Sequence, residues 1–327
     1  AGTNCYYLTF KSQEAVDSVF KDAEAMGLKV IRVWGNLDVG VKTGTTDSEG
    51  KPVFTNNNDG PGEKDGIYFQ YFDKALGKPV TNFGEDGIKK LDYALYQAEK
   101  HGIKLLITFT NYWDAFGGMG QYVKWAEELG ITGLKKDDFY TNETLKGWYK
   151  DYVNGLLNHT NPYTNRKLKD EPSVFAWELS NEPRCNTDAQ CKDNILYNWA
   201  KEMSEYVKSI DPNHMVSLGD EGFYNKPYGY YDEYTTSNYA FYGAEGVDFE
   251  KLMTIDTLDF GTPHLYLDQW GMKHTGTGQD DLLWFKIHGE TCAELGKPVI
   301  LEEFGLTDRT IRDSEYKQWF EVLEGNV

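Results

Sequence analysis

Residues 88–109 read IKKLDYALYQAEKHGIKLLITF. Apolar residues recur at every third or fourth position from Ile88 to Ala98, and Gly102 closes this helical pattern. The apolar run 103–109 that follows has the length and composition of a buried strand. This stretch therefore predicts a helix that leads directly into a buried strand.

The same unit recurs along the chain. An earlier copy pairs a helix that ends at Gly27 with the run 28–33, and the later copies comprise helices at about 142–157, 195–210 and 281–295 with strands at 174–179, 214–218, 257–262 and 298–303. Because helices separate near-continuous apolar strands, we expect a parallel sheet. An open doubly wound sheet usually carries a Gly-rich phosphate turn, and no G-x-G-x-x-G or G-x-x-x-x-G-K-[ST] occurs. The pattern favours an α/β fold of the (β/α)8 TIM barrel type.

The count of units predicts one catalytic barrel domain over residues 1–327. Within it, the polar stretch 36–85 is typical of an excursion from the scaffold. The chain starts where a first strand would be ending, and only a helix at about 312–323 follows the last strand. We therefore expect the start of the first strand and the eighth β/α unit to be missing, with truncation at the C-terminus.

Composition narrows the classes of partner. The chain has 33 Lys and Arg against 52 Asp and Glu, a net charge of −19, which disfavours nucleic acid and anionic surfaces. A mean hydropathy of −0.61, with no apolar run near 18 residues, predicts no membrane span. Aromatic residues make up 15% of the chain, more than a core of this size requires, so we expect some rings to line a binding surface. Cys185 and Cys191 are close enough to form a disulfide, although two free packed thiols fit the spacing equally well.

Nearly every predicted strand ends in a polar or aromatic residue. The strand ends, in order, are Arg32 and Trp34, Asn111 and Trp113, Asn181 and Glu182, Asp220 and Glu221, His264 and Tyr266, and Glu302 and Glu303. Such residues are ordinarily solvated loop starts, but six strands in succession indicate a site, which a barrel forms at the carboxyl ends of its strands.

Arg32 must have a carboxylate partner, because a guanidinium inside a strand cannot lose its charge. Strand alternation points Glu303 toward the barrel interior, so we predict an Arg32–Glu303 pair. The same alternation directs Glu302 the other way, and we expect it to be structural.

Glu182 also faces inward by alternation, whereas Asn181 would face away. Both side chains can reach one site only if the strand is irregular there, and we predict such an irregularity.

Two carboxylates on different strands, one beside a cation and one not, are what glycoside hydrolysis requires. One attacks as the anion and the other donates a proton to the leaving oxygen. A metal centre would use similar residues, but no H-E-x-x-H, paired-Cys or EF-hand pattern occurs, so we predict no metal and no cofactor.

Several motifs, in register over nearly the whole chain, resemble a known family. Asn181-Glu182-Pro183, His264-x-Tyr266 and Glu303-Phe304-Gly305 resemble glycoside hydrolase family 5. More narrowly, the segments 32–35, 111–118, 177–185, 219–223 and 262–266 are similar to its endo-β-1,4-mannanases.

The resemblance implies retaining, endo-acting hydrolysis of β-1,4-mannosidic bonds in mannan, galactomannan and glucomannan. It implies Glu182 as acid/base and Glu303 as nucleophile, with supporting roles for Arg32, Asn181, His264 and Tyr266, and substrate contacts from Trp34, Trp113, Arg184 and Glu221. Its partners would be β-mannan polysaccharide and manno-oligosaccharides, acted on by a secreted, extracellular monomer. The family's platform tryptophan on the eighth strand lies beyond this sequence.

Three alternatives remain open. An endo-β-1,4-glucanase would use the same barrel, and a catalytically silent carbohydrate-binding barrel would keep the aromatic residues. In the third, Arg32 and Glu303 form only a structural ion pair of an inactive scaffold. In the retaining case we expect the Glu182 and Glu303 carboxyl groups about 5 to 5.5 Å apart, against about 8 Å for inversion.

Overall fold

The computed structural model describes residues 1–59, 65–186, 191, 194–231, 238–272 and 280–325. No helix in these ranges is long and apolar enough to cross a membrane.

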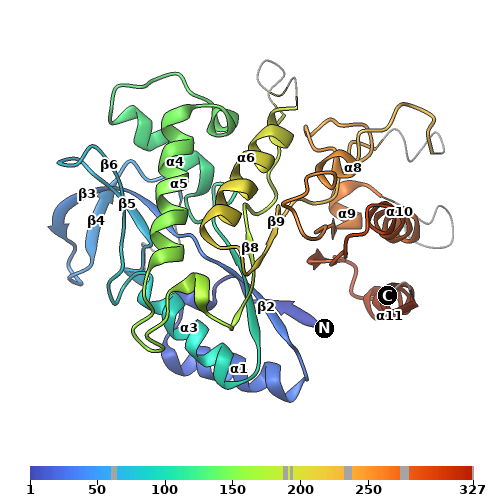
Figure 1. Ribbon diagram of the computed structural model, residues 1–327, viewed down its shortest axis with the longest axis horizontal. Helices are drawn as coiled ribbons and strands as arrows, with labels where there is room; N and C mark the ends of the chain where they lie inside the picture. The colour runs from blue at the N-terminus through green and yellow to red at the C-terminus, as the bar shows by residue number, and fades with distance from the viewer. Residues whose placement is uncertain (60–64, 187–190, 192–193, 232–237, 273–279, 326–327) are drawn as a thin grey trace.

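A curved parallel sheet forms the centre of the molecule (Figure 1). Its strands, in sheet order, are β1 (Gly2–Asn4), β2 (Val30–Trp34), β7 (Lys104–Thr108), β8 (Val174–Glu178) and β9 (Met215–Ser217). All neighbouring pairs are parallel, and β2 lies against β7 with Val30 opposite Lys104 and Trp34 opposite Thr108. The first strand, of which the sequence predicted only the end, is the short β1.

Two further parallel strands continue the barrel in less regular form. β10 (His264–Leu265) pairs with β11 (Glu303–Phe304), and a single bridge joins Gly261 to Val299. The predicted strand 257–262 contributes this bridge and a hydrogen bond of 2.8 Å from Asp259 N to Val216 O, rather than a regular strand. The described residues thus supply seven barrel strands and no eighth.

Helices cover the outside of the sheet, as the alternation predicted (Figure 1). They are α1 (Gln13–Ala25), α3 (Lys89–Lys100), α4 (Gly118–Glu127), α5 (Glu143–Asn158), α6 (Ile195–Ile210), α8 (Phe249–Leu252), α9 (Leu267–Trp270), α10 (Asp280–Glu294) and α11 (Arg312–Gly325). Gly27 and Gly102 follow α1 and α3 with φ of 74° and 63°, a left-handed conformation that glycine adopts without strain. This turn directs the chain from each helix into the next strand.

The excursion at 36–85 contains a second sheet. Its strands, in sheet order, are β4 (Pro52–Thr55), β3 (Asp38–Thr46), β5 (Gln70–Asp73) and β6 (Lys78–Thr81). This sheet lies beside the barrel, near α4 and α5 (Figure 1). The polar composition of the segment gave no sign of it.

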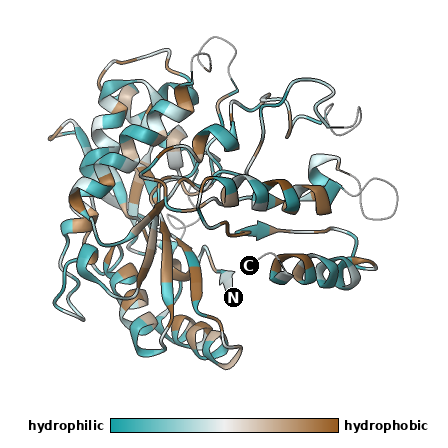
Figure 2. Ribbon diagram, turned by 45° about the vertical axis from the view of Figure 1, so that its right-hand side comes forward, coloured by the Kyte–Doolittle hydropathy of each residue, from teal (hydrophilic) through white to brown (hydrophobic). Residues whose placement is uncertain are grey.

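Most apolar side chains pack between the strands and the helices. Hydrophobic residues concentrate on the central strands, while the helices combine hydrophobic and hydrophilic positions (Figure 2). A smaller cluster joins Leu106 of β7 and Ala176 of β8 to Phe260, which lies in the irregular segment 257–262. The polar groups lie beyond this apolar cluster, at the carboxyl ends of the strands.

Candidate active site

The predicted strand-end residues meet at one end of the barrel. Glu182 and Asn181 follow β8, the fourth strand, and Glu303 opens β11, the seventh. Because all seven strands are parallel, their carboxyl ends lie together. Residues more than one hundred positions apart in the sequence thereby become neighbours.

Arg32 contacts three other side chains of the site. Its Nη1 donates to Glu303 Oε1 at 2.6 Å, which gives the predicted pair, and its Nη2 donates to Asn181 Oδ1 at 2.8 Å. Nη2 also contacts Glu178 Oε1 at 2.7 Å, and both the Arg32 and Glu178 side chains are buried. Glu178 was not among the candidate residues predicted from the sequence. Its signal is that a buried guanidinium has more N–H donors than Glu303 alone can accept from, so a second acceptor has to lie nearby.

Glu303 is held as an anion. The Tyr266 hydroxyl donates to Glu303 Oε2 at 2.7 Å, and Arg32 binds the other oxygen. Burial alone would raise the pKa of Glu303, but the charges of His264 and Arg32 and the Tyr266 hydrogen bond lower it to about 2. This carboxylate is therefore charged throughout the neutral range.

Glu182 has a different set of partners. His264 Nδ1 lies 2.7 Å from Glu182 Oε1, and Trp113 Nε1 donates to Oε2 at 2.5 Å. The backbone of Glu182 has φ of 48°, so the predicted irregularity lies at this residue. It brings Asn181 and Glu182 to the same site.

The two carboxylates are close together. A carboxylate oxygen of Glu182, one of Glu303 and a ring nitrogen of His264 all lie within 4.8 Å of one another. Retaining glycosidases hold their carboxyl groups about 5–5.5 Å apart and inverting enzymes about 6.5–9.5 Å apart. The short separation fits the retaining mechanism, in which one carboxylate attacks the sugar directly, because no water molecule fits between the two carboxyl groups.

Two hollows open beside this pair. A cavity of about 890 Å³ reaches Arg32 and Glu303, but it also touches Ala1, Val30 and Ile300 at the other end of the strands, so it runs along the side of the barrel between β1 and β11. A second, of about 510 Å³, is lined by Trp113, Glu182, Arg184, Glu221, Tyr239, Tyr266, Gln269, Trp270 and Glu303. The second hollow is therefore the one confined to the carboxyl ends of the strands.

Arg184 shapes the second hollow. It binds Glu221 with its Nε 2.8 Å from Oε2, and its guanidinium carbon lies 5.0 Å from the Trp113 ring centroid and 4.9 Å from that of Phe223. Burial and the charge of Glu182 raise the pKa of Glu221 to about 8, although Arg184 opposes the shift. Trp113 is 41% exposed, so its ring is open to a ligand.

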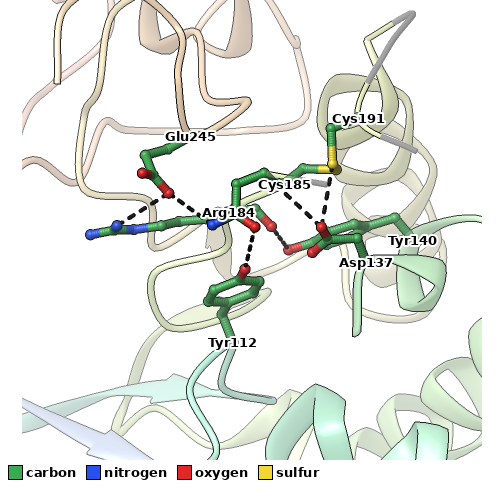
Figure 3. The surroundings of a disulfide bond; sticks show 8 residues. Tyr112, Asp137, Tyr140, Arg184, Cys185, Cys191 and Glu245 are labelled. Atoms are coloured by element: carbon green, nitrogen blue, oxygen red, sulfur yellow. Dashed lines mark hydrogen bonds and ion pairs between the residues drawn. A yellow bond between two sulfur atoms is a disulfide. The ribbon is translucent and has the colours of Figure 1, made fainter. Parts of the chain in front are cut away.

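A disulfide between Cys185 and Cys191 resolves the alternative that the sequence left open (Figure 3). The bridge follows Arg184 directly, and the Tyr140 hydroxyl donates to Arg184 O at 2.7 Å. Cys5 and Cys292 are buried free thiols. The disulfide thus restrains the segment that carries Arg184.

Two predicted residues lie deeper than expected. Trp34 is only 6% exposed and lies beneath Arg32, whose guanidinium carbon is 4.8 Å from the ring centroid. The prediction that Glu302 faces away was wrong: its side chain is buried, with Oε2 3.5 Å from Arg32 Nε. Val299 pairs with Gly261 and Glu303 pairs with His264, so the register shifts by one residue between these two pairs and strand alternation does not hold across the segment.

The same residues could in principle coordinate a metal, since Glu182, His264 and Glu303 offer three donor atoms within reach of one ion. These atoms already take part in hydrogen bonds and ion pairs with one another and with Arg32 and Tyr266. A second group, Asp137 with Cys185 and Cys191, lacks thiolates because the cysteines are bridged.

Known proteins share this arrangement of sequence and fold. Residues 72–322 match the family model described as GH family 5 beta-mannosidase-like. The chain is 39% identical over 307 residues to "Probable mannan endo-1,4-beta-mannosidase F" of Aspergillus oryzae, covering 94% of this chain and 57% of that protein. It thus spans little more than half the length of that curated relative.

Solved structures of endo-mannanases have a similar fold. The endo-1,4-beta-mannanase from Rhizomucor miehei superposes with a TM-score of 0.83 at 36% identity, covering 99% of this chain and 82% of that one. The endo-beta-1,4-mannanase from Thermotoga petrophila gives 0.81 at 38% identity, covering 99% of this chain and 65% of that one. With the TIM barrel and the paired carboxylates, these matches show that the chain belongs to glycoside hydrolase family 5, among its β-mannosidase-like members.

Proposed function

We propose that the protein hydrolyses internal β-1,4-mannosidic bonds of mannan, galactomannan and glucomannan, with retention of configuration. The observation that carries the proposal is the close approach of Glu182 and Glu303 within 4.8 Å, each with its own partners. The names of the relatives from Aspergillus, Rhizomucor and Thermotoga support mannan as the substrate.

In the first step Glu303 attacks the anomeric carbon while Glu182 donates its proton to the leaving oxygen. The C–O bond to the leaving sugar breaks and a glycosyl ester on Glu303 forms. Arg32 and Tyr266 hold Glu303 as the anion and aim its oxygens. The low pKa of Glu303, produced by His264, Arg32 and Tyr266 against the effect of burial, keeps this nucleophile charged over the whole working range.

In the second step Glu182, now a carboxylate, takes a proton from water, and the hydroxide cleaves the ester. His264 and Trp113 contact the two oxygens of Glu182, so they orient the group in both steps. Asn181 is fixed by Arg32 and by a 3.0 Å hydrogen bond from its Nδ2 to Asn111 Oδ1. This position suits contact with the 2-hydroxyl of the sugar that is cleaved.

The names of the relatives, which are endo-acting mannosidases and mannanases, support internal cleavage. The second hollow, beside Glu182, has room for the leaving part of the substrate. Trp113 and Arg184 present a ring and a fixed guanidinium on the side of Glu182, where the leaving part of the chain would bind. We assign Glu221 to the same side, and Trp34 to the support of Arg32 on the other.

The test is the release of reducing ends from galactomannan, glucomannan and carboxymethyl-cellulose, together with viscosity. Rapid loss of galactomannan viscosity at low release of reducing ends is expected. Equal turnover of cellulose would favour the glucanase alternative. Binding of mannan without any release of sugar would favour a silent binding barrel.

We also propose that the protein acts outside the cell as a monomer. A disulfide persists in an oxidising compartment, and a net charge of −19 makes copies repel one another and nucleic acid. Light scattering tests the monomer, and fractionation of the source culture tests secretion.

A further inference from the structure

The His264 ring lies between two carboxylates. Its Nδ1 is 2.7 Å from Glu182 Oε1, and its Nε2 is 3.5 Å from Glu302 Oε2. The imidazole is fully buried. The partner of one ring nitrogen determines what the other can do, so Glu302 bears on the contact with Glu182.

Glu302 is a buried acid with few partners. Its Oε2 lies 3.5 Å from Arg32 Nε, and its Oε1 has no hydrogen-bond partner in the described part of the chain. A buried carboxylate is costly unless cations or donors face it. The groups within reach are Arg32 and His264.

Arg32 is already occupied elsewhere. Its Nη1 and Nη2 serve Glu303, Asn181 and Glu178, and its Nε is 3.1 Å from Glu178 Oε1. Arg32 carries one positive charge, which the carboxylates of Glu178 and Glu303 already share. The other group beside Glu302 that can carry a positive charge is His264. Burial, followed by the charge of Glu178, raises the pKa of Glu302 to about 8, while Arg32 and His264 lower it.

The electrostatics of the imidazole agree with this geometry. Burial would lower the pKa of His264, but the surrounding carboxylates, led by Glu303 and followed by Glu182 and Glu302, raise it well above its usual value. The titratable or charged groups that act on His264 or on Glu302 are Arg32, Glu178, Glu182, Asp220, Glu221 and Glu303. Arg32 is the only permanent cation among them.

We propose that Glu302 is a positioning residue of the reaction: its Oε2 accepts the Nε2–H of His264 and keeps the Nδ1–H directed at Glu182. This role rests on the proposed function, since it concerns the acid/base of that reaction. Glu182 gives its proton to the leaving oxygen, and the neighbouring imidazolium stabilises the carboxylate that remains. Glu182 later takes a proton from water and returns to its starting state.

The test removes the acceptor by the substitution Glu302→Leu, which keeps the bulk of the side chain. Glu302→Gln keeps one acceptor oxygen and should restore the wild-type behaviour. Without an acceptor for its Nε2–H, His264 loses its proton at lower pH, and the neutral ring no longer stabilises ionised Glu182. The alkaline limb of kcat/KM on mannan should then move up by about one pH unit. An alkaline limb that stays in place or moves down would overturn the proposal.

Glu171→Leu is the matched control. Glu171 is a fully buried carboxylate paired with Arg166, whose Nε is 2.9 Å from Glu171 Oε2. Its replacement should reduce stability and leave the pH limbs of kcat/KM where they are. A merely structural role for Glu302 would make the two variants behave alike.

A second measurement does not depend on activity. Nitrogen-15 NMR of the wild-type side chains, with His264 assigned among the six histidines by His264→Gln, should show both ring N–H groups of His264 at neutral pH. A single ring N–H would contradict the proposal even if Glu302→Leu failed to fold. If the wild type released no sugar from mannan, the proposed function would fail, while this spectrum would still decide the state of His264.

Discussion

Arg32 Nη1 lies 2.6 Å from Glu303 Oε1, although 271 positions separate the two residues in the sequence. The contact joins the second strand of the barrel to the seventh, and the same guanidinium reaches Glu178 and Asn181 from the fourth. A single buried cation thus holds one carboxylate ionised and aligns the neighbouring amide. The proposed chemistry depends on this connection.

Arg32→Lys should impair both folding and catalysis. Lysine cannot serve Glu178, Asn181 and Glu303 together, and disrupting a buried pair typically costs about 3–5 kcal/mol. Arg32 lowers the pKa of Glu303, so without the guanidinium that pKa rises and the acid limb of kcat/KM moves to higher pH. Arg166→Lys, outside the site, is the control and should leave the acid limb in place. An unchanged acid limb in Arg32→Lys would contradict this reading.

Glu303→Gln should abolish turnover while the protein still binds manno-oligosaccharides. The amide cannot form the glycosyl ester, and Arg32 keeps its contacts with Glu178 and Asn181, so the fold should survive. Isothermal titration calorimetry measures the retained binding. Residual turnover near the wild-type rate would exclude Glu303 as the nucleophile.

Glu182→Gln should reduce hydrolysis of mannan by roughly 10²–10⁴-fold, the usual contribution of a general acid. An aryl mannoside with a very acidic leaving group needs no proton, so formation of its glycosyl ester should be nearly normal. A pre-steady-state burst of phenolate, followed by slow turnover that azide accelerates, is the expected signature. Equal losses on both substrates would argue against the acid role.

Removal of the disulfide by Cys185→Ser with Cys191→Ser should lower the free energy of unfolding by about 2 kcal/mol, from the entropy of closing a short loop. Because Arg184 precedes the bridge, KM should rise more than kcat falls. Cys292→Ser, which alters a buried free thiol, controls for the loss of a cysteine. An unchanged KM would mean that the bridge does not position Arg184.

The sequence was sufficient where one local rule decided the outcome. Helical spacing closed by glycine predicted α1 and α3, and the charge of a guanidinium inside a strand predicted its pairing with Glu303. The motif Asn181-Glu182 required an irregular backbone if both side chains were to reach one site, and Glu182 provides it.

The rest depended on tertiary contacts. Glu302 was misplaced because alternation assumes regular pairing, which the segment before β11 lacks. The sheet of β3 to β6 was missed because its strands contain glycine, threonine and lysine at exposed positions rather than an apolar run. The spacing of Cys185 and Cys191 fitted both a bridge and two thiols, and only their approach in space separated these possibilities.

Trapping the reaction halfway tests the proposed chemistry most directly. A 2-deoxy-2-fluoro-mannosyl fluoride should glycosylate the protein once, and mass spectrometry of the peptides should place the sugar on Glu303. Proton NMR of the normal reaction should show that the β-anomer forms first. A label on Glu182, or an α-anomer as the first product, would contradict the assignment of Glu303 as the nucleophile of a retaining enzyme.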